Sequence, residues 1–215
     1  DALKDKIKRP ELPIIPQPNM FFQPLKKICL TNNFSLVEGD MFFSKMQTLT
    51  VSVNVVGVMG KGLASTAKYR FPDVYVAYQD LCRKRALQMG KPYLYKRESS
   101  RDDLLADEAS TLANNKLATW FLLFATKRHW RDRGDIIGIE KGLQWILDNY
   151  KSDRVSSLAV PALGCGLGGL EWRDVGPLLY KYLSSLDITV EIYLPAEKKI
   201  PDEQLGHDFL SKVQN

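Results

Sequence analysis

Short apolar runs alternate along the chain with stretches that are apolar on one helical face only. The runs at residues 48–56, 120–125 and 157–160 have the length and composition of buried strands. A helical pattern follows each of them, and at residues 135–149 the apolar positions recur at intervals of three and four. Strands that alternate with helices in this way predict a three-layer α/β domain.

Weaker patterns complete the order of elements. Strands are predicted at residues 26–31, 35–38, 92–97 and 188–194, and helices at 63–70, 73–85, 172–186 and 202–213. The first 25 residues hold five prolines and predict an extended arm before a single domain at residues 26–215. Residues 98–119 are polar and charged, contain a short helical pattern at 102–113, and form an insertion in that domain.

The turn after the third apolar run carries the strongest chemical signal. It reads PALGCGLGG at residues 161–169, and four of its last six residues are glycines, a segment called the 164–169 turn below. Glycines let the backbone approach a ligand closely, and N–H groups at the start of the next helix attract an anion. We therefore expect a pyrophosphate there, with an unliganded tight turn as the alternative.

A second glycine turn follows the first apolar run. It reads GVMGKG at residues 57–62, between a strand rich in β-branched residues and a helix, and is called the 57–62 turn. Its spacing differs from the dinucleotide-binding fingerprint, and its lysine is not followed by Ser or Thr as in a Walker loop. Two such turns predict a ligand with two phosphates held between them.

The second apolar run ends abruptly in a charged segment, TKRHW at residues 126–130. In open α/β sheets, ligands bind at the carboxyl ends of the strands. We therefore expect Asn54, Lys127 and the two glycine turns to lie on one rim of the sheet. The alternative is a basic strand end that is merely solvated.

Composition limits the class of protein. The chain has 215 residues, of which 45% are hydrophobic and 26% charged, as in an ordinary soluble globular domain. No apolar run approaches the roughly 18 residues that span a bilayer, and the polar, basic N-terminus shows no signal peptide. These features predict an intracellular protein, cytoplasmic or nuclear, without a membrane partner. The net charge of +5 favours anionic nucleotides or nucleic acid but is too small to establish DNA binding.

Three cysteines and two histidines offer little metal chemistry. Cys29, Cys82 and Cys165 are odd in number and lack metal-ligand spacing, which fits a reducing compartment. We therefore predict neither a metal ion nor another cofactor. Cys165 lies inside the 164–169 turn, and we interpret it as a small buried residue rather than a nucleophile.

Three of these segments together resemble one protein family. NVVGVMGKG at residues 54–62, TKRHW at 126–130 and PALGCGLGGLEW at 161–172 are similar, in this order, to macrodomains of the DarG type. Gly39, Asp40 and Met41 resemble an early element of the same family. The resemblance runs from about residue 35 to about residue 195, and extends more distantly to the terminal ADP-ribose protein glycohydrolase. It implies a three-layer α/β/α macrodomain with a mixed central sheet.

The resemblance also implies ADP-ribose as the ligand. Asp40 would accept a hydrogen bond from the adenine amino group, near the Met41 backbone, and Asn54 would bond the distal ribose. Read without the resemblance, Asp40 is equally a helix or turn cap and Asn54 a turn residue. The 57–62 turn would wrap the distal ribose and a phosphate, and the 164–169 turn would hold the pyrophosphate. The other residues assigned to the ligand in this way are Gly57, Val58, Met59, Gly60, Lys61, Gly62, Thr126, Leu163, Gly164, Cys165, Gly166, Leu167 and Gly168.

The resemblance implies that hydrolysis requires a lysine at this position, so Lys127 is the main catalytic candidate. The bond at C1 of the distal ribose breaks through an oxocarbenium-like state. Lys127 would either act as a nucleophile through the opened sugar or protonate the leaving group, and both roles stay open. His129 is the second catalytic candidate, with a positioning role or a DNA contact as the alternative.

Three neighbours of this lysine, Arg128, Trp130 and Arg131, are predicted to contact DNA. Trp130 would stack on an unpaired base, and the alternative is that it packs in the core. The terminal glycohydrolase has an acidic residue at the position matched by Gly168. Because this chain lacks that acid, the resemblance favours ADP-ribose linked to nucleic acid over ADP-ribose linked to protein.

The predicted function is therefore an ADP-ribosyl hydrolase that removes ADP-ribose from thymidine in single-stranded DNA. The alternatives are a non-catalytic ADP-ribose-binding domain and a hydrolase for protein-linked ADP-ribose. A third hypothesis is an interaction protein that neutralises a DarT-like ADP-ribosyltransferase through the 98–119 insertion, which exceeds the connection expected in DarG-type domains. We expect the chain to be a monomer.

Overall fold

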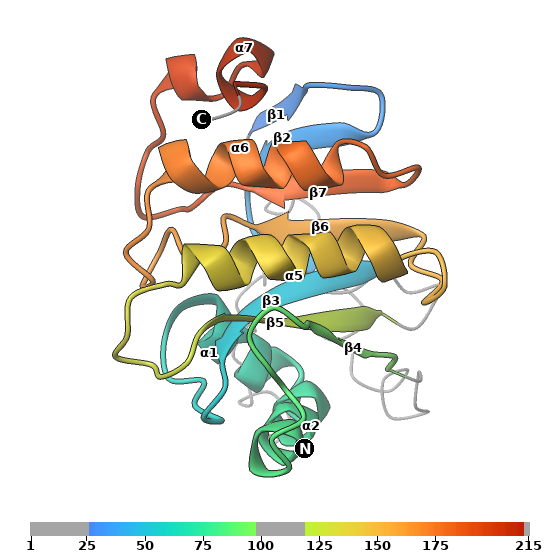
Figure 1. The fold of residues 1–215 in the computed structure, drawn as a ribbon, viewed down its shortest axis with the longest axis vertical. Coiled ribbons are helices and arrows are strands. Elements are labelled where there is room, and N and C mark those ends of the chain that lie inside the picture. Colours follow the sequence, from blue (N-terminus) through green and yellow to red (C-terminus); the bar gives the residue numbers. More distant parts are fainter. Residues whose placement is uncertain (1–25, 98–118, 213–215) are drawn as a thin grey trace, which may run out of the picture.

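A computed structural model describes residues 26–97 and 119–212 of the chain. Within these residues, seven strands form one mixed sheet in the order β1-β2-β7-β6-β3-β5-β4 (Figure 1). The strands are β1 Lys26–Cys29, β2 Phe34–Glu38, β3 Thr48–Asn54, β4 Tyr93–Tyr95, β5 Trp120–Lys127, β6 Ser157–Pro161 and β7 Thr189–Tyr193. The five inner strands run parallel, and the edge strands β1 and β4 are antiparallel to their neighbours.

Helices cover both faces of the sheet. In Figure 1, α5 (Ile136–Asn149) and α6 (Trp172–Leu183) cross in front of it. The other face packs against α1 (Gly62–Arg70) and α2 (Pro72–Arg83). The predicted three-layer α/β/α fold with a mixed sheet is confirmed.

Successive side chains of β5 point to opposite faces of the sheet, so this strand packs against the helices of both outer layers. Phe121 and Leu123 belong to the core shared with α1 and α2, whereas Leu122 and Phe124 belong to the core shared with α5 and α6. A Cβ at Gly142 of α5 would lie 2.4 Å from Cζ of Phe124, so the absence of a side chain there lets the helix approach the strand. This packing fixes the strand that carries Lys127.

Several element boundaries differ from the prediction by one to three residues, as where α2 ends at Arg83 and α6 at Leu183, and two differences are of another kind. β5 continues through Thr126 and Lys127, beyond the apolar run at residues 120–125. The single helix predicted at residues 202–213 is wrong in its described part, which is a 3-10 turn (Asp202–Gln204) followed by the short helix α7 (His207–Leu210). Gly206 separates the two with an extended backbone, so no continuous helix can pass through it.

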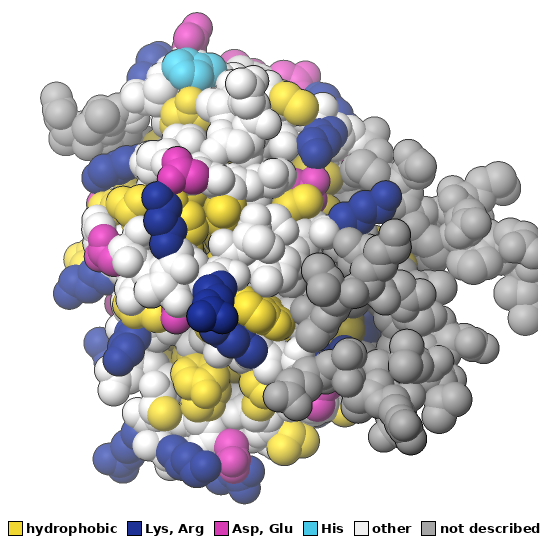
Figure 2. Space-filling view, turned by 90° about the vertical axis from the view of Figure 1, so that its right-hand side faces the viewer, with side chains coloured by type: hydrophobic (Ala, Val, Ile, Leu, Met, Phe, Trp, Pro, Cys, Tyr) yellow, Lys and Arg dark blue, Asp and Glu magenta, His cyan; other side chains and the backbone are white. Residues whose placement is uncertain are grey.

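The predictions for residues 1–25, for the helical pattern at 102–113 and for nearly all of the 98–119 insertion lie outside the described residues. Among those that are described, no helix combines the length and the apolar character needed to cross a bilayer. The right-hand side of Figure 1 faces the viewer in Figure 2, where basic side chains lie among acidic and hydrophobic ones. Charges of both signs are therefore mixed on that face.

Candidate active site at the carboxyl ends of the parallel strands

Three parallel strands end side by side at one rim of the sheet. β3 lies between β6 and β5, so Asn54, Pro161 and Lys127 mark three neighbouring strand ends. The loop at residues 128–135, which precedes α5, leaves the sheet at this rim (Figure 1). The segments that were expected to share a rim therefore do so.

Side-chain hydrogen bonds from Asn54 hold the start of the 57–62 turn. The Oδ1 of Asn54 accepts from the backbone N–H of Val56 at 3.1 Å and of Val58 at 3.3 Å. Its Nδ2 donates to the carbonyl of Val58 at 2.7 Å. The side chain is 5% exposed, so these bonds form away from water. Asn54 thus has the turn-forming role, and a bond to ribose stays a prediction.

Tyr78 of α2 supports the same turn by a hydrogen bond to Asn54. Its hydroxyl lies 2.9 Å from both the carbonyl oxygen and the Oδ1 of Asn54. Burial raises the pKa of this phenol, so the hydroxyl keeps its proton and remains a donor. The position of α2 against the sheet therefore fixes the amide that shapes the turn.

Glycine packing and main-chain bonds shape the 164–169 turn instead. A Cβ at Gly168 would lie 2.5 Å from the carbonyl oxygen of Gly164, and Gly164 itself has a φ of +74°. The N–H of Leu170 donates to the carbonyl of Gly164 at 2.9 Å, and the N–H of Gly134 donates to the carbonyl of Gly168 at 2.7 Å. Only glycine fits where this backbone folds against itself.

Both turns present free backbone donors. Among the described residues, the N–H groups of Gly166, Leu167 and Gly168 have no protein acceptor. Helix α1 begins at Gly62 without a side-chain cap from Lys61, so its first N–H groups are also open. Consecutive unpaired N–H groups and a helix N-terminus attract anions, as the expected pyrophosphate requires.

The two turns contact each other through Leu167. This side chain is 67% exposed, and its Cδ1 lies 3.5 Å from where a Cβ of Gly62 would be. An apolar residue that projects from one turn over the end of the other narrows the space between them. A ligand held by both turns would bury Leu167.

A β-bulge directs Lys127 at the end of β5. Val53 pairs with Ala125 but Asn54 pairs with Lys127, so Thr126 is the extra residue. Thr126 is buried and its hydroxyl lies 2.9 Å from the Oγ of Ser52. Bulges bend a strand and re-aim its side chains, often beside active sites.

The ammonium group of Lys127 bridges two loops. Its Nζ donates to the carbonyl of Trp130 at 3.0 Å and to the carbonyl of Leu167 at 3.2 Å. These bonds hold the amine against the 164–169 turn, beside its unpaired N–H groups. The lysine predicted to be catalytic therefore lies where the anion is expected.

The segment after Lys127 presents an exposed aromatic surface. Trp130 is 46% exposed, so it is not part of the core, and the guanidinium of Arg131 lies 4.4 Å from the centre of its ring. The Nδ1 of His129 accepts from the N–H of Arg131 at 3.3 Å, and its ring lies beside that of Trp130. His129 thus shapes this loop, and its catalytic role stays a prediction.

Asp40 lies in a turn and forms an ion pair that the sequence did not reveal. Its Oδ1 accepts from the N–H of Phe42 and caps the 3-10 turn at Met41–Phe43. Its Oδ2 lies 2.7 Å from Nη1 of Arg70, the last residue of α1. The cap interpretation of Asp40 is therefore confirmed, and an adenine contact stays a prediction that would share the carboxylate with Arg70.

Several residues assigned to the ligand have buried side chains. Besides Asn54, they are Met41, Met59, Thr126, Leu163 and Cys165. Burial raises the pKa of the Cys165 thiol to about 12, so the thiol stays protonated and is a poor nucleophile. This supports the interpretation of Cys165 as a packing residue.

No group of three or more His, Cys, Asp or Glu side chains within the described parts of the chain is placed to hold a metal ion. The polar atoms at the rim include backbone N–H groups, the amines of Lys61 and Lys127 and the side chains of residues 128–131. They are suited to bind an anion and an aromatic base.

A model of the macrodomain family matches residues 51–179, which is more than half of the chain. This chain belongs to the macrodomain family. The matched residues contain both glycine turns and Lys127, whereas Asp40 and Met41 precede them.

Relatives of this macrodomain include a DNA ADP-ribosyl transferase–DNA ADP-ribosyl glycohydrolase fusion protein of Thermosipho africanus. It is 63% identical over 208 residues, which are 97% of this chain and 54% of that protein. The structure of Thermosipho africanus DarTG in complex with ADP-ribose has a TM-score of 0.83 and covers 92% of this chain and 51% of its own. The DarG macrodomain of Thermus aquaticus is 32% identical with a TM-score of 0.64, and covers 75% of this chain and 98% of its own. The chain spans about half the length of the curated relatives it matches.

The sequence did not reveal every residue that shapes the site. Tyr78 occupies an apolar-face position of a predicted helix, where nothing marks its hydroxyl as a hydrogen-bond donor to Asn54. Arg70 lies 30 residues from Asp40, and no local pattern joins them. Both contacts depend on how α1 and α2 pack against the sheet, which only the tertiary structure defines.

Proposed function

We propose that this macrodomain is an ADP-ribosyl hydrolase that releases ADP-ribose from thymidine in single-stranded DNA. The observation that carries the proposal is the contact of the Lys127 Nζ with the carbonyl of Leu167 at 3.2 Å. This contact puts an amine beside unpaired N–H groups that can bind a pyrophosphate. The names of the related proteins, which include DNA ADP-ribosyl glycohydrolase, support the same reaction.

ADP-ribose would lie across the rim between the two glycine turns. The N–H groups of residues 166–168 and the start of α1 would bind the pyrophosphate, whose charge the helix N-terminus favours. The 57–62 turn, held in shape by Asn54, would support the distal ribose. C1 of that ribose would then lie near Lys127, with the attached base directed toward Trp130.

Two roles of Lys127 satisfy this chemistry. As an ammonium ion, it would donate a proton to the departing base while the bond from C1 breaks and water adds to C1. As a free amine, it would attack C1 of the opened sugar, the base would leave with the bonding electron pair, and water would then release the amine. Trapping with borohydride separates the two roles, because only the second forms a reducible adduct.

DNA specificity would come from the exposed segment after Lys127. Trp130 offers a ring face to an unpaired base, and stacking of this kind is worth about 1–3 kcal/mol per base. Arg128 and Arg131 would contact the phosphate backbone beside it. A DNA substrate also implies that the reaction takes place inside the cell.

The test is release of ADP-ribose from ADP-ribosylated single-stranded DNA by wild type and by Lys127→Ala. We expect release by wild type and a loss of roughly a hundred- to ten-thousand-fold in the variant. Lys151→Ala is the matched control, because this exposed lysine follows α5 and pairs with Asp187, away from the rim. Tight ADP-ribose binding by wild type without release from DNA would instead establish a binding domain without turnover.

We also propose that a DNA ADP-ribosyltransferase supplies the substrate. The support is the relative from Thermosipho africanus, whose name joins both activities in one protein. Co-expression of this chain with such a transferase should remove the modification from cellular DNA, and the Lys127→Ala variant should not. If both variants protected the cell equally, the chain would act by binding the transferase rather than by hydrolysis.

A further inference from the structure

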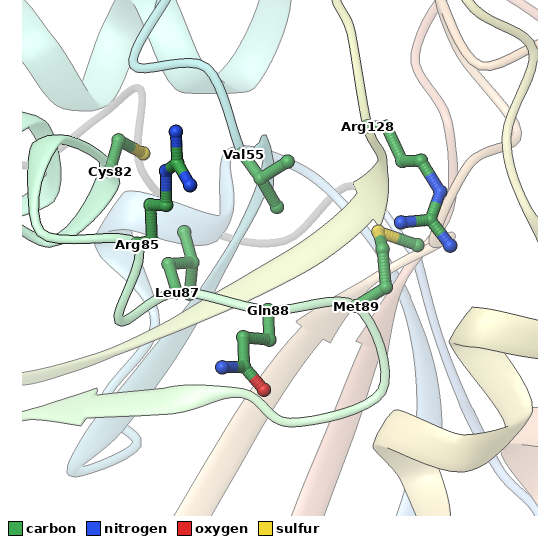
Figure 3. Close-up of a pocket in the computed structure, with 7 residues that line it drawn as sticks. All are labelled: Val55, Cys82, Arg85, Leu87, Gln88, Met89 and Arg128. Atoms are coloured by element: carbon green, nitrogen blue, oxygen red, sulfur yellow. The ribbon is translucent and has the colours of Figure 1, made fainter.

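A cavity of about 430 Å³ lies beside the rim and uses none of the groups assigned to ADP-ribose. Figure 3 shows the residues that line it: Val55, Cys82, Arg85, Leu87, Gln88, Met89 and Arg128. They come from the end of β3, the end of α2, the segment before β4 and the end of β5. The volume is in the range of pockets that hold small molecules or single nucleotides.

Arg85 has an unusual backbone conformation for an arginine. Its φ is +54°, and it follows the C-cap of α2. The N–H of Ala86 donates to the carbonyl of Leu81 at 2.8 Å, and that of Arg85 donates to Cys82 at 3.0 Å. This pattern of two bonds is the helix ending in which glycine is usual. A left-handed conformation costs a non-glycine residue about 1–2 kcal/mol, so the backbone alone does not favour arginine here.

In the ranges that the structure describes, neither arginine of the cavity, Arg85 or Arg128, has a carboxylate partner for its guanidinium group. The adjacent cations do have one, because Arg83 and Lys84 both contact Asp80. Figure 3 shows the two free guanidinium groups on either side of Val55. Two unpaired guanidinium groups beside one cavity favour a phosphate, which accepts paired N–H donors.

The cavity also offers surfaces for a base. Val55, Leu87 and Met89 supply apolar area, and Gln88 supplies an amide that can donate and accept. A free inorganic anion would use only the guanidinium groups. A nucleotide would use the whole lining.

The residue that follows Lys127 in the chain lines this cavity. Arg128 is the next residue, and its carbonyl accepts from the N–H of Val55 at 3.1 Å. Lys127 is directed toward the 164–169 turn, whereas Arg128 lines the cavity. The cavity therefore adjoins the strand end that carries Lys127, on the side to which Arg128 is directed.

We propose that the cavity binds the nucleotide next to the modified thymidine, with its phosphodiester between Arg85 and Arg128. This inference rests on the proposed function, because it names a subsite for the same DNA substrate. Arg85 and Gln88 are thereby added to the DNA-contacting residues.

The test measures DNA binding apart from ADP-ribose binding. For Arg85→Gly, we expect the affinity for unmodified single-stranded DNA, followed by fluorescence anisotropy, to fall about tenfold. The slope of log affinity against log salt concentration should decrease by about one, because one phosphate contact is lost. The affinity for free ADP-ribose, measured by calorimetry, should equal that of wild type. The KM for ADP-ribosylated DNA should rise by the same factor as the DNA affinity falls.

Two further variants keep the result interpretable. Glycine suits a φ of +54°, so Arg85→Gly should unfold at the same temperature as wild type or higher, which excludes misfolding as the cause. Arg83→Ala removes a cation two residues away that is paired with Asp80 and does not line the cavity, and it should bind DNA as wild type does.

Other outcomes overturn the proposal. Equal DNA affinity for wild type and Arg85→Gly would show that the cavity is not a nucleotide subsite. A fall in ADP-ribose affinity would show that it belongs to the ADP-ribose cleft. If wild type released nothing from ADP-ribosylated DNA while Arg85→Gly still weakened DNA binding, the proposed hydrolysis would fail and the subsite would stand.

Discussion

The two glycine turns of this macrodomain face each other across the site, but different interactions hold them. The 57–62 turn depends on one buried amide, since Asn54 makes three hydrogen bonds to the backbone of Val56 and Val58 and Tyr78 supports Asn54. The 164–169 turn depends on the absence of side chains, because its backbone folds within 2.5 Å of where a Cβ of Gly168 would lie. Similar glycine content in the sequence therefore conceals two distinct sources of rigidity.

The difference predicts opposite responses to mutation. In the 57–62 turn, a Cβ at Gly60 would meet only Val58, at 3.9 Å. Gly60 therefore tolerates alanine, unlike Gly57 and Gly62, whose φ is positive, and Asn54 does not tolerate change. In the 164–169 turn, the side-chain hydrogen bond of the buried Cys165 is weak, to the carbonyl of Leu163 at 3.8 Å, and the glycines define the shape of the backbone.

The largest effect should come from Asn54→Ala. The variant removes the three hydrogen bonds of the amide to the backbone, of about 1 kcal/mol each, whereas the Tyr78 hydroxyl that also bonds the amide keeps the Asn54 carbonyl as a partner, so the free energy of unfolding should fall by about 3 kcal/mol. Urea unfolding followed by circular dichroism measures this. Gly60→Ala is the matched control in the same turn and should change the free energy by less than about 0.5 kcal/mol. A larger effect for Gly60→Ala than for Asn54→Ala would reverse the comparison.

Gly168→Ala should have the next largest effect, on binding. The added methyl group must displace the carbonyl of Gly164, at a cost of about 2 kcal/mol, which corresponds to roughly thirtyfold weaker ADP-ribose binding by calorimetry. Gly166→Ala is the control inside this turn, because its Cβ would meet no atom within 4 Å. If the two variants bound ADP-ribose equally, close backbone packing would not be what shapes the 164–169 turn.

The sequence predicted the parts of the site that depend on local pattern. Apolar runs predicted the parallel strands, and the glycine spacing predicted both turns at their carboxyl ends. The direction of Lys127 was not predictable, since it depends on a bulge at Thr126 that appears only when β3 and β5 are paired. Nor was the ion pair of Asp40 with Arg70, whose geometry is defined by the packing of α1.

Arg85 is another residue whose position in the structure the sequence did not predict. The sequence placed it in the last turn of a predicted helix, where a cation is unremarkable because it complements the helix dipole. Only the structure reveals that α2 ends two residues earlier, that Arg85 has a positive φ and that it lines a cavity with Arg128. A periodic hydrophobic pattern misses residues whose role depends on where a helix ends.

The smallest effect should come from Tyr78→Phe, which tests how α2 supports the 57–62 turn. Loss of the hydroxyl that bonds Asn54 should lower the free energy of unfolding by about 1 kcal/mol at neutral pH, with little change in ADP-ribose affinity, because Asn54 keeps its own bonds to the turn.

The pH dependence of the unfolding free energy tests the role of Tyr78 more sharply. Burial raises the pKa of Tyr78 in the folded state, so the folded protein holds this proton more tightly than the unfolded chain does. Its contribution is therefore complete below the unfolded pKa of about 10 and is lost as the pH rises above that value. Wild type should lose stability more steeply than Tyr78→Phe above about pH 10. Parallel curves would mean that the buried phenol does not hold Asn54, and that the amide alone shapes the turn.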